Sequence, residues 1–318
     1  MEFSVLLLLA AFGGGLFGAA IGGQPAFIFT GFMVFIGIGT ALAGVEYDFL
    51  GNVAFGPVFG PHVAFGGAVA AAAYAARVGD LDSGRDIASP VAGMGKPGAL
   101  VVGGVFGAGA YVVKTALDAV LVVPGDAGLF YTDTVALTVG ISAVVARLAF
   151  GKTGLFGSVS VEANERGRFF PGGEQVWVIH QQGFAQASVL GVGTGLLGGF
   201  IVASMAQINP DSLAFSANLG FGIAAASLIV LQFGFNGPVT HHMILPGGLA
   251  AAAVLASGGP DVAAIIAAAV AGVAGALLGE VYSRLFLIHG DTHIDPPALA
   301  IFTMTTVIVL FRVAFGAV

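Results

Sequence analysis

The chain has 318 residues, of which 57% are hydrophobic and 8% are charged. Soluble domains carry roughly 25% charged residues, so this composition excludes an ordinary soluble fold. The formal charge of -7 and the pI near 5.2 exclude an extended basic surface, and therefore nucleic acid as a partner.

Apolar segments follow one another along the chain, and each is long enough to cross a hydrocarbon core of roughly 30 Å as a helix. The first begins Met1-Glu2-Phe3-Ser4 and lacks the basic region of a secretory signal, so we expect a permanent helix. We predict an all-α polytopic membrane protein with about ten transmembrane helices. The predicted spans are 4–22, 25–44, 52–75, 97–122, 131–150, 183–206, 213–231, 233–256, 260–285 and 297–316.

An internal repeat divides the chain into two halves. The Gly-Pro-Val of Gly56–Val58 returns 181 residues later as Gly237–Val239. A second block, residues 125–151, returns at an offset of 165 as residues 290–316. Shared alanine and glycine content alone would be weak evidence, but ordered motifs at constant offset indicate a duplication.

Each half holds five predicted spans, so the second half enters the membrane from the opposite side and the repeats are inverted. The predicted units are a first repeat (1–151), a linker (152–181) and a second repeat (182–318). The positive-inside rule makes the linker cytoplasmic and places both termini outside. We expect an integral protein of a prokaryotic plasma membrane, embedded in the lipid bilayer as a monomer or homo-oligomer. The basic residues on the predicted cytoplasmic side are Arg77, Arg85, Lys96, Arg147, Lys152, Arg166, Arg168 and Arg284, against Arg312 outside.

The third and eighth spans contain helix-breaking residues at corresponding positions. Pro57 and Pro61 lie in the third span, and Pro238 and Pro246 lie in the eighth. Proline removes a backbone donor and clashes with the preceding turn, so both spans should be kinked or unwound. Because inverted-repeat transporters bind their solutes at broken helices near the bilayer midplane, we predict a site between the halves at these breaks.

Histidines lie inside both broken spans. His62 falls beside His242 in the repeat alignment, one position out of register. An ionisable residue at membrane depth is a functional candidate, and paired imidazoles could bind a small ion or relay a proton. The alternative is a neutral ring that bonds a carbonyl freed by proline. We expect His62 and His242 to face the solute and His241 to be the most structural. Supporting groups are Asn236, Thr240, Pro57 and Pro238.

Charged and amide side chains elsewhere are candidates for gating or coupling. Lys114 and Asp118 are four residues apart on one helix face and can pair, as can Glu280 and Arg284. Interfacial pairing with snorkelling is the alternative for both pairs. Two glutamines at comparable turns, Gln24 and Gln207, are further candidates, with turn capping as their alternative role.

The segment 289–295 holds the densest set of potential metal ligands. If it is extended, alternate side chains point to one side, and imidazole with carboxylate suits zinc or another divalent first-row ion. Turn chemistry is the alternative for Asp beside Pro. The four candidate ligands are His289, Asp291, His293 and Asp295.

The sequence contains no GxSxG, HExxH or Walker motif and no cysteine, so it gives no sign of a familiar enzyme site. We predict a permease or channel for a small polar solute or ion, with no cofactor. The alternatives are an intramembrane metalloenzyme that uses the 289–295 cluster, and a structural subunit of a larger membrane complex. The pattern does not name the solute or the coupling ion, nor distinguish a pore from alternating access.

Overall fold

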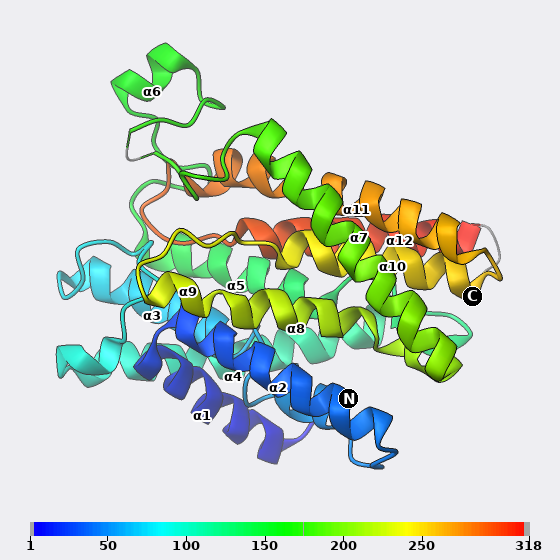
Figure 1. Cartoon of the computed structure of the whole chain (residues 1–318). Coiled ribbons are helices and arrows are strands. Elements are labelled where there is room, and N and C mark those ends of the chain that lie inside the picture. The colour runs from blue at the N-terminus through cyan, green and yellow to red at the C-terminus, as the bar shows by residue number, and fades with distance from the viewer. Residues whose placement is uncertain (1–2, 174, 315–318) are drawn as a thin grey trace.

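Helices make up most of the chain in the computed structural model, which describes residues 3–173 and 175–314 (Figure 1). Within these residues, five helices are long and apolar enough to cross a membrane. They are α2 (Gly23–Leu42), α4 (Pro97–Leu121), α7 (Phe184–Ile208), α11 (Asp261–Tyr282) with its π-helical continuation η4 (Ser283–Leu287), and α12 (Pro296–Ala314). A helical protein with candidate membrane spans is thereby confirmed.

Shorter apolar helices occupy the other predicted intervals. They are α1 (Val5–Ile21), α3 (Ala64–Val78), α5 (Thr134–Phe150), α8 (Ala217–Ser227) followed by α9 (Ile229–Gln232), and α10 (His241–Ala256). The two broken spans supply α3 and α10. These helices are short because their first turns are replaced by irregular backbone.

The helices run back and forth along the bundle, so their connections gather at two ends (Figure 1). The linker, with the short helix α6 (Val161–Arg166), projects at one end, which we call the linker end. The loop that contains η2 (Val91–Met94) lies at the same end, where its Arg85 donates to the carbonyl of Val176 in the linker at 2.9 Å. The other end, the hairpin end, carries strands β1 (Val122–Val123) and β2 (Asp126–Phe130) and the 3-10 helix η3 (Pro210–Ala214).

Both predicted helix breaks are present. Residues 55–63 form turns between the π-helical η1 (Leu50–Ala54) and α3, and residues 233–240 are non-helical between α9 and α10. Pro246 does not break its helix, because α10 continues past it. The carbonyl four residues before Pro246 receives no helical hydrogen bond, since proline has no N–H.

Glycine brings three helices of the first half to backbone contact. Gly15 of α1 faces the Gly103 carbonyl of α4 so closely that a Cβ on Gly15 would lie 2.3 Å from its oxygen. Gly67 of α3 approaches the same oxygen, where a Cβ would lie at 2.6 Å. Small residues permit this proximity in membrane helices, where close packing replaces the hydrophobic effect.

The second half has a crossing of the same kind. Gly195 of α7 faces the Ala268 carbonyl of α11, and a Cβ added to Gly195 would lie 2.4 Å from that oxygen. Gly247 of α10 approaches the same oxygen, at 3.1 Å from its own Cβ position. Each half is thus held together where the first, third and fourth of its five apolar helices meet.

The two halves meet through α2 against α8 and α5 against α12. One hydrophobic cluster runs across this contact and includes buried side chains of both halves. In this cluster the Phe27 ring of α2 contacts two other rings. Its centroid lies 5.8 Å from that of Phe65 in α3 and 5.5 Å from that of Phe221 in α8.

The glycine crossing gives a matched stability test. Gly15→Ala should lower the free energy of unfolding by about 1–3 kcal/mol, because the new methyl group overlaps the α4 backbone. Gly13→Ala is the control on the same helix, since nothing lies within 4 Å of its Cβ position. Thermal unfolding of both variants in one detergent measures the difference. Equal melting temperatures would contradict the backbone contact.

Candidate functional site

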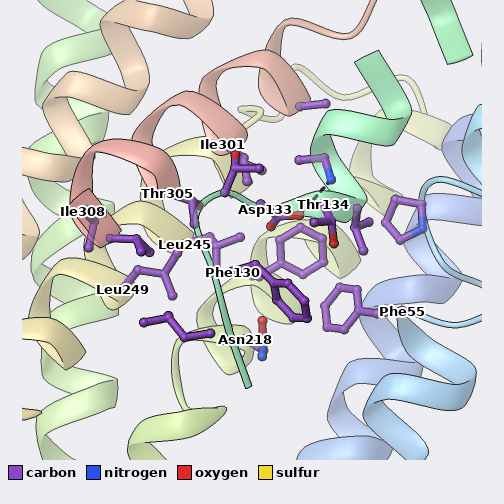
Figure 2. Close-up of a pocket in the computed structure, with 18 of the residues that line it drawn as sticks. Phe55, Phe130, Asp133, Thr134, Asn218, Leu245, Leu249, Ile301, Thr305 and Ile308 are labelled. Carbon is purple, nitrogen blue, oxygen red and sulfur yellow. Dashed lines mark hydrogen bonds between the residues drawn. The ribbon is translucent and has the colours of Figure 1, made fainter. Parts of the chain in front are cut away.

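A cavity of about 640 Å³ opens at the hairpin end. Figure 2 shows its wall, in which Phe55, Phe130 and Leu245 face a common space with Asp133, Thr134 and Asn218. Asp133 also caps α5, because its carboxylate accepts the Ala136 N–H at 2.8 Å. The cavity is largely apolar, with polar groups at a few points, as in most small-molecule sites.

A second cavity, of about 730 Å³, opens at the linker end. The loop after α3 contributes Arg85 and Asp86, and the linker contributes the single tryptophan, Trp177. The predicted gating residue Gln24 and the predicted supporting residue Asn236 also line this cavity. Arg85 is engaged with the Val176 carbonyl.

Four residues line both cavities: Phe27, Phe65, His241 and Asp295. Because the cavities open at opposite ends of the bundle, these four side chains form the wall between them, which we call the septum. Phe27 comes from α2, and Asp295 directly precedes α12. Phe65 and His241 belong to the first turns of α3 and α10. The two breaks therefore deliver the starts of both short helices to the middle of the bundle.

The septum side chains contact one another and their neighbours closely. The ring centroids of Phe27 and His241 are 4.7 Å apart, and those of Phe65 and His293 are 5.9 Å apart. His293 Nε2 lies 3.1 Å from one carboxylate oxygen of Asp295, and the Ala298 N–H donates to the other oxygen at 2.8 Å. Asp295 is thus held as the cap of α12 while it lines both cavities.

The linker supplies hydrogen bonds to the second break. The Gln181 amide group donates to the Val239 carbonyl at 3.0 Å and accepts the Val239 N–H at 2.9 Å. His180 Nε2 lies 2.8 Å from the Gly237 carbonyl. In the first break, the Thr30 hydroxyl donates to the Phe59 carbonyl at 2.6 Å. Sequence reasoning missed Gln181, whose only signal was its position at the end of the linker.

His62 and His242, the histidines expected to face the solute, line neither cavity. Both are fully buried, at 1% and 0% exposure. The His242 ring packs against Trp177, with 5.6 Å between centroids, and neither of its nitrogens has a hydrogen-bond partner among the described residues. His241, expected to be structural, is the histidine that faces both cavities.

The predicted charge pairs both form. Lys114 Nζ lies 2.6 Å from Asp118, whose other oxygen accepts from the Thr134 hydroxyl at 2.6 Å. Lys114 and Thr134 line the hairpin-end cavity, so this pair belongs to its wall. Arg284 lies 3.3 Å from Glu280 and donates to the Gln182 carbonyl at 2.6 Å, away from both cavities. The second pair therefore joins the α11–η4 helix to the residue that directly follows the linker.

The remaining candidates lie outside the cavity walls. Gln207 donates to Asp261 at 3.0 Å on an exposed surface at the hairpin end. The Thr240 carbonyl accepts the Met243 N–H at 2.9 Å at the start of α10. Pro57 is buried and Pro238 is exposed, each inside its break.

The four potential metal ligands do not come together. His289 bonds the Arg168 carbonyl at 2.9 Å, and His293 pairs with Asp295. Asp291 accepts from the Thr153 hydroxyl and the Lys152 N–H. Burial opposes ionisation of Asp291, but these hydrogen bonds outweigh it and lower its pKa below the usual range. Within residues 3–173 and 175–314, no three His, Asp or Glu side chains are placed to hold a metal ion. The segment is an irregular connection between η4 and α12, and its side chains bond separate partners rather than converging on one point.

One protein-family model, described as a family of unknown function (DUF7973), matches residues 1–169 and again residues 161–316. Together the two matches cover almost the whole chain, which therefore belongs to this family. No curated protein matches the chain. No solved structure matches it either.

Removing the Gln181 amide should destabilise the second break. Gln181→Leu should cost about 2–4 kcal/mol of unfolding free energy, because the buried N–H and carbonyl of Val239 both lose their partner. Gln186→Leu is the control, since Gln186 is exposed on α7. Denaturant or thermal unfolding compares the two. A Gln181→Leu protein as stable as the control would show that the amide is not needed.

Proposed function

We propose that this member of DUF7973 is an integral membrane permease or channel, through which a small polar solute or ion passes between two five-helix halves. The observation that carries the proposal is the pair of cavities that open at opposite ends and share the septum. A permease must admit its solute from either side and keep a barrier between the two openings. Transporters built from inverted repeats have their binding site and this barrier near the bilayer midplane.

Helix packing supports two equivalent halves. In the first, α1 packs on α3 and α4, and α3 packs on α5; in the second, α7 packs on α10 and α11, and α10 packs on α12. The contacts between the halves join α2 to its counterpart α8 and α5 to its counterpart α12, as two-fold symmetry requires. The family model that matches twice, once in each half, agrees with a duplication.

The glycine crossings refine the alignment of the halves. Gly15 and Gly195 occupy matching places and are 180 residues apart, as are Gly67 and Gly247. An offset of 180 in this region, rather than 181, brings His62 into register with His242. The two buried histidines then occupy matching positions, His62 at the end of the first break and His242 in the first turn of α10.

The charges at the linker end support the membrane topology that we propose. Arg85 donates to the carbonyl of Val176 in the linker, and Arg168 of the linker donates to that of Leu285. Arg284 donates to the carbonyl of Gln182, directly after the linker. Ten apolar helices in alternating direction, with these cations at one end, give ten spans and a cytoplasmic linker by the positive-inside rule.

Cysteine labelling tests the two-sided access. The chain has no cysteine, so a single introduced thiol has no background. Asn218→Cys in the hairpin-end cavity should react with a membrane-impermeant maleimide in intact cells, and Asn236→Cys in the linker-end cavity only in inside-out vesicles. Val270→Cys is the control, being 65% exposed on the apolar surface of α11; it should stay unlabelled in lipid. Labelling of both asparagine positions from one side would contradict the proposal.

Thinning the septum should open a leak. A double Phe27→Ala, Phe65→Ala variant removes two rings from the shared wall, and loss of an apolar constriction lets water and ions enter. We expect salt efflux from proteoliposomes to rise on the order of tenfold or more. The matched control is Phe17→Ala with Phe200→Ala, both more than half exposed at 51% and 62%. A folded septum variant as tight as this control would count against a path at the septum.

A further inference from the structure

The septum carries a carboxylate and no lysine or arginine. Among the four side chains that line both cavities, Asp295 is the acidic one. Its oxygens are oriented by His293 and by the Ala298 N–H. Both contacts leave the carboxylate at the wall of the cavities, where a cation would meet it.

Two phenylalanine rings line both cavities together with this carboxylate. Phe27 and Phe65 meet at 5.8 Å with an interplanar angle of 63°, and Phe27 lies 4.7 Å from the His241 ring. Phe221 extends the group, 6.0 Å from His241. A small cation over an aromatic face is attracted by the ring quadrupole, and the attraction grows when the site is desolvated.

His241 provides an independent sign of a ligand. Its side chain is 5% exposed and lines both cavities, yet its Nδ1 has no hydrogen-bond partner in the part of the chain that the structure describes. Buried polar atoms are nearly always bonded. An N–H-bearing cation bound against this ring would bring a donor to the imidazole and an opposite charge to Asp295.

The cations nearest the path are already engaged. Lys114 in the hairpin-end wall is paired with Asp118 at 2.6 Å, and Arg85 in the linker-end wall donates to the Val176 carbonyl. Arg312 lies in the hairpin-end wall at the far end of α12. The other ionisable wall residues, apart from the septum's own His241 and Asp295, are Asp86, Asp126, Asp133, His180 and His293.

Each half contributes one capping aspartate to the cavities. Asp133 caps α5 through the Ala136 N–H and Asp295 caps α12 through the Ala298 N–H, both at 2.8 Å. The helices α5 and α12 pack against each other across the halves. Both carboxylates line the hairpin-end cavity, and Asp295 also lines the linker-end cavity.

We infer that the septum binds a small ammonium-type cation, either ammonium or a protonated short amine, between the Asp295 carboxylate, the Phe27 and Phe65 rings and His241. The inference rests on the proposed function and names its substrate class. One carboxylate matches a single positive charge, the rings attract a weakly hydrated cation, and the imidazole accepts one of its N–H groups.

A binding assay on the purified full-length chain tests this inference without transport. Trp177 is the only tryptophan and lines the linker-end cavity, so its fluorescence reports on the site. Methylammonium chloride is titrated against N-methylglucamine chloride at constant ionic strength, with ammonium, sodium and potassium chloride in parallel. We expect a saturable change with methylammonium and ammonium, at least about tenfold weaker for sodium and potassium.

Asp295→Asn should weaken methylammonium binding at least about tenfold. Asparagine still accepts the Ala298 N–H and caps helices well, so the fold should persist, and an unchanged melting curve in the absence of ligand checks it. Asp211→Asn is the control, since Asp211 is exposed on η3. Phe65→Leu gives a second reading, because it should weaken methylammonium more than sodium by removing one aromatic face.

Three results would overturn the inference: no saturable response to methylammonium or ammonium, equal binding by Asp295→Asn and the parent chain, or tighter binding of sodium or potassium. The proposed function fails separately. Methylammonium binding with one-sided cysteine labelling would leave a cation site without a path, whereas two-sided labelling and a septum leak without binding would leave a path for another solute.

Discussion

Backbone groups that leave a helix inside an apolar bundle must find partners within the protein, because neither lipid nor side-chain hydrocarbon can bond them. This constraint governs the two breaks. At residues 233–240 the Gln181 amide bonds both backbone groups of Val239, and His180 reaches Gly237. At residues 55–63 the Thr30 hydroxyl bonds Phe59. With these groups satisfied, α3 and α10 can begin in the middle of the bundle rather than at its ends.

The short helices in turn create the cavities. A full-length helix would have filled the space that the missing first turns of α3 and α10 leave open at either end of the bundle. The starts of these helices place Phe65 and His241 between the two openings. Asp295 joins them because α12 also begins there. The septum therefore consists of residues at the starts of α3, α10 and α12 together with Phe27 of α2. Among the described residues, no three His, Asp or Glu side chains are placed to hold a metal ion.

Sequence periodicity and proline placement predicted the helices and both breaks well, since hydrophobic length and the missing N–H of proline act locally. The site was harder to predict. Whether His241 or His242 faces the cavity depends on the rotation of α10 after its break, which spacing does not encode. Gln181 lay in a polar linker that gave no sign of folding back onto span eight. Asp295 resembled an ordinary turn residue beside proline, and only the contact between the halves makes it part of the septum.

Access to a single septum position from both sides tests the central claim most directly. A His241→Cys chain, reconstituted in vesicles of known orientation, would be exposed to a small impermeant methanethiosulfonate from either side in separate experiments. Because His241 lines both cavities, the account predicts modification from each side. Modification from one side only, or from neither in a folded protein, would contradict a shared septum.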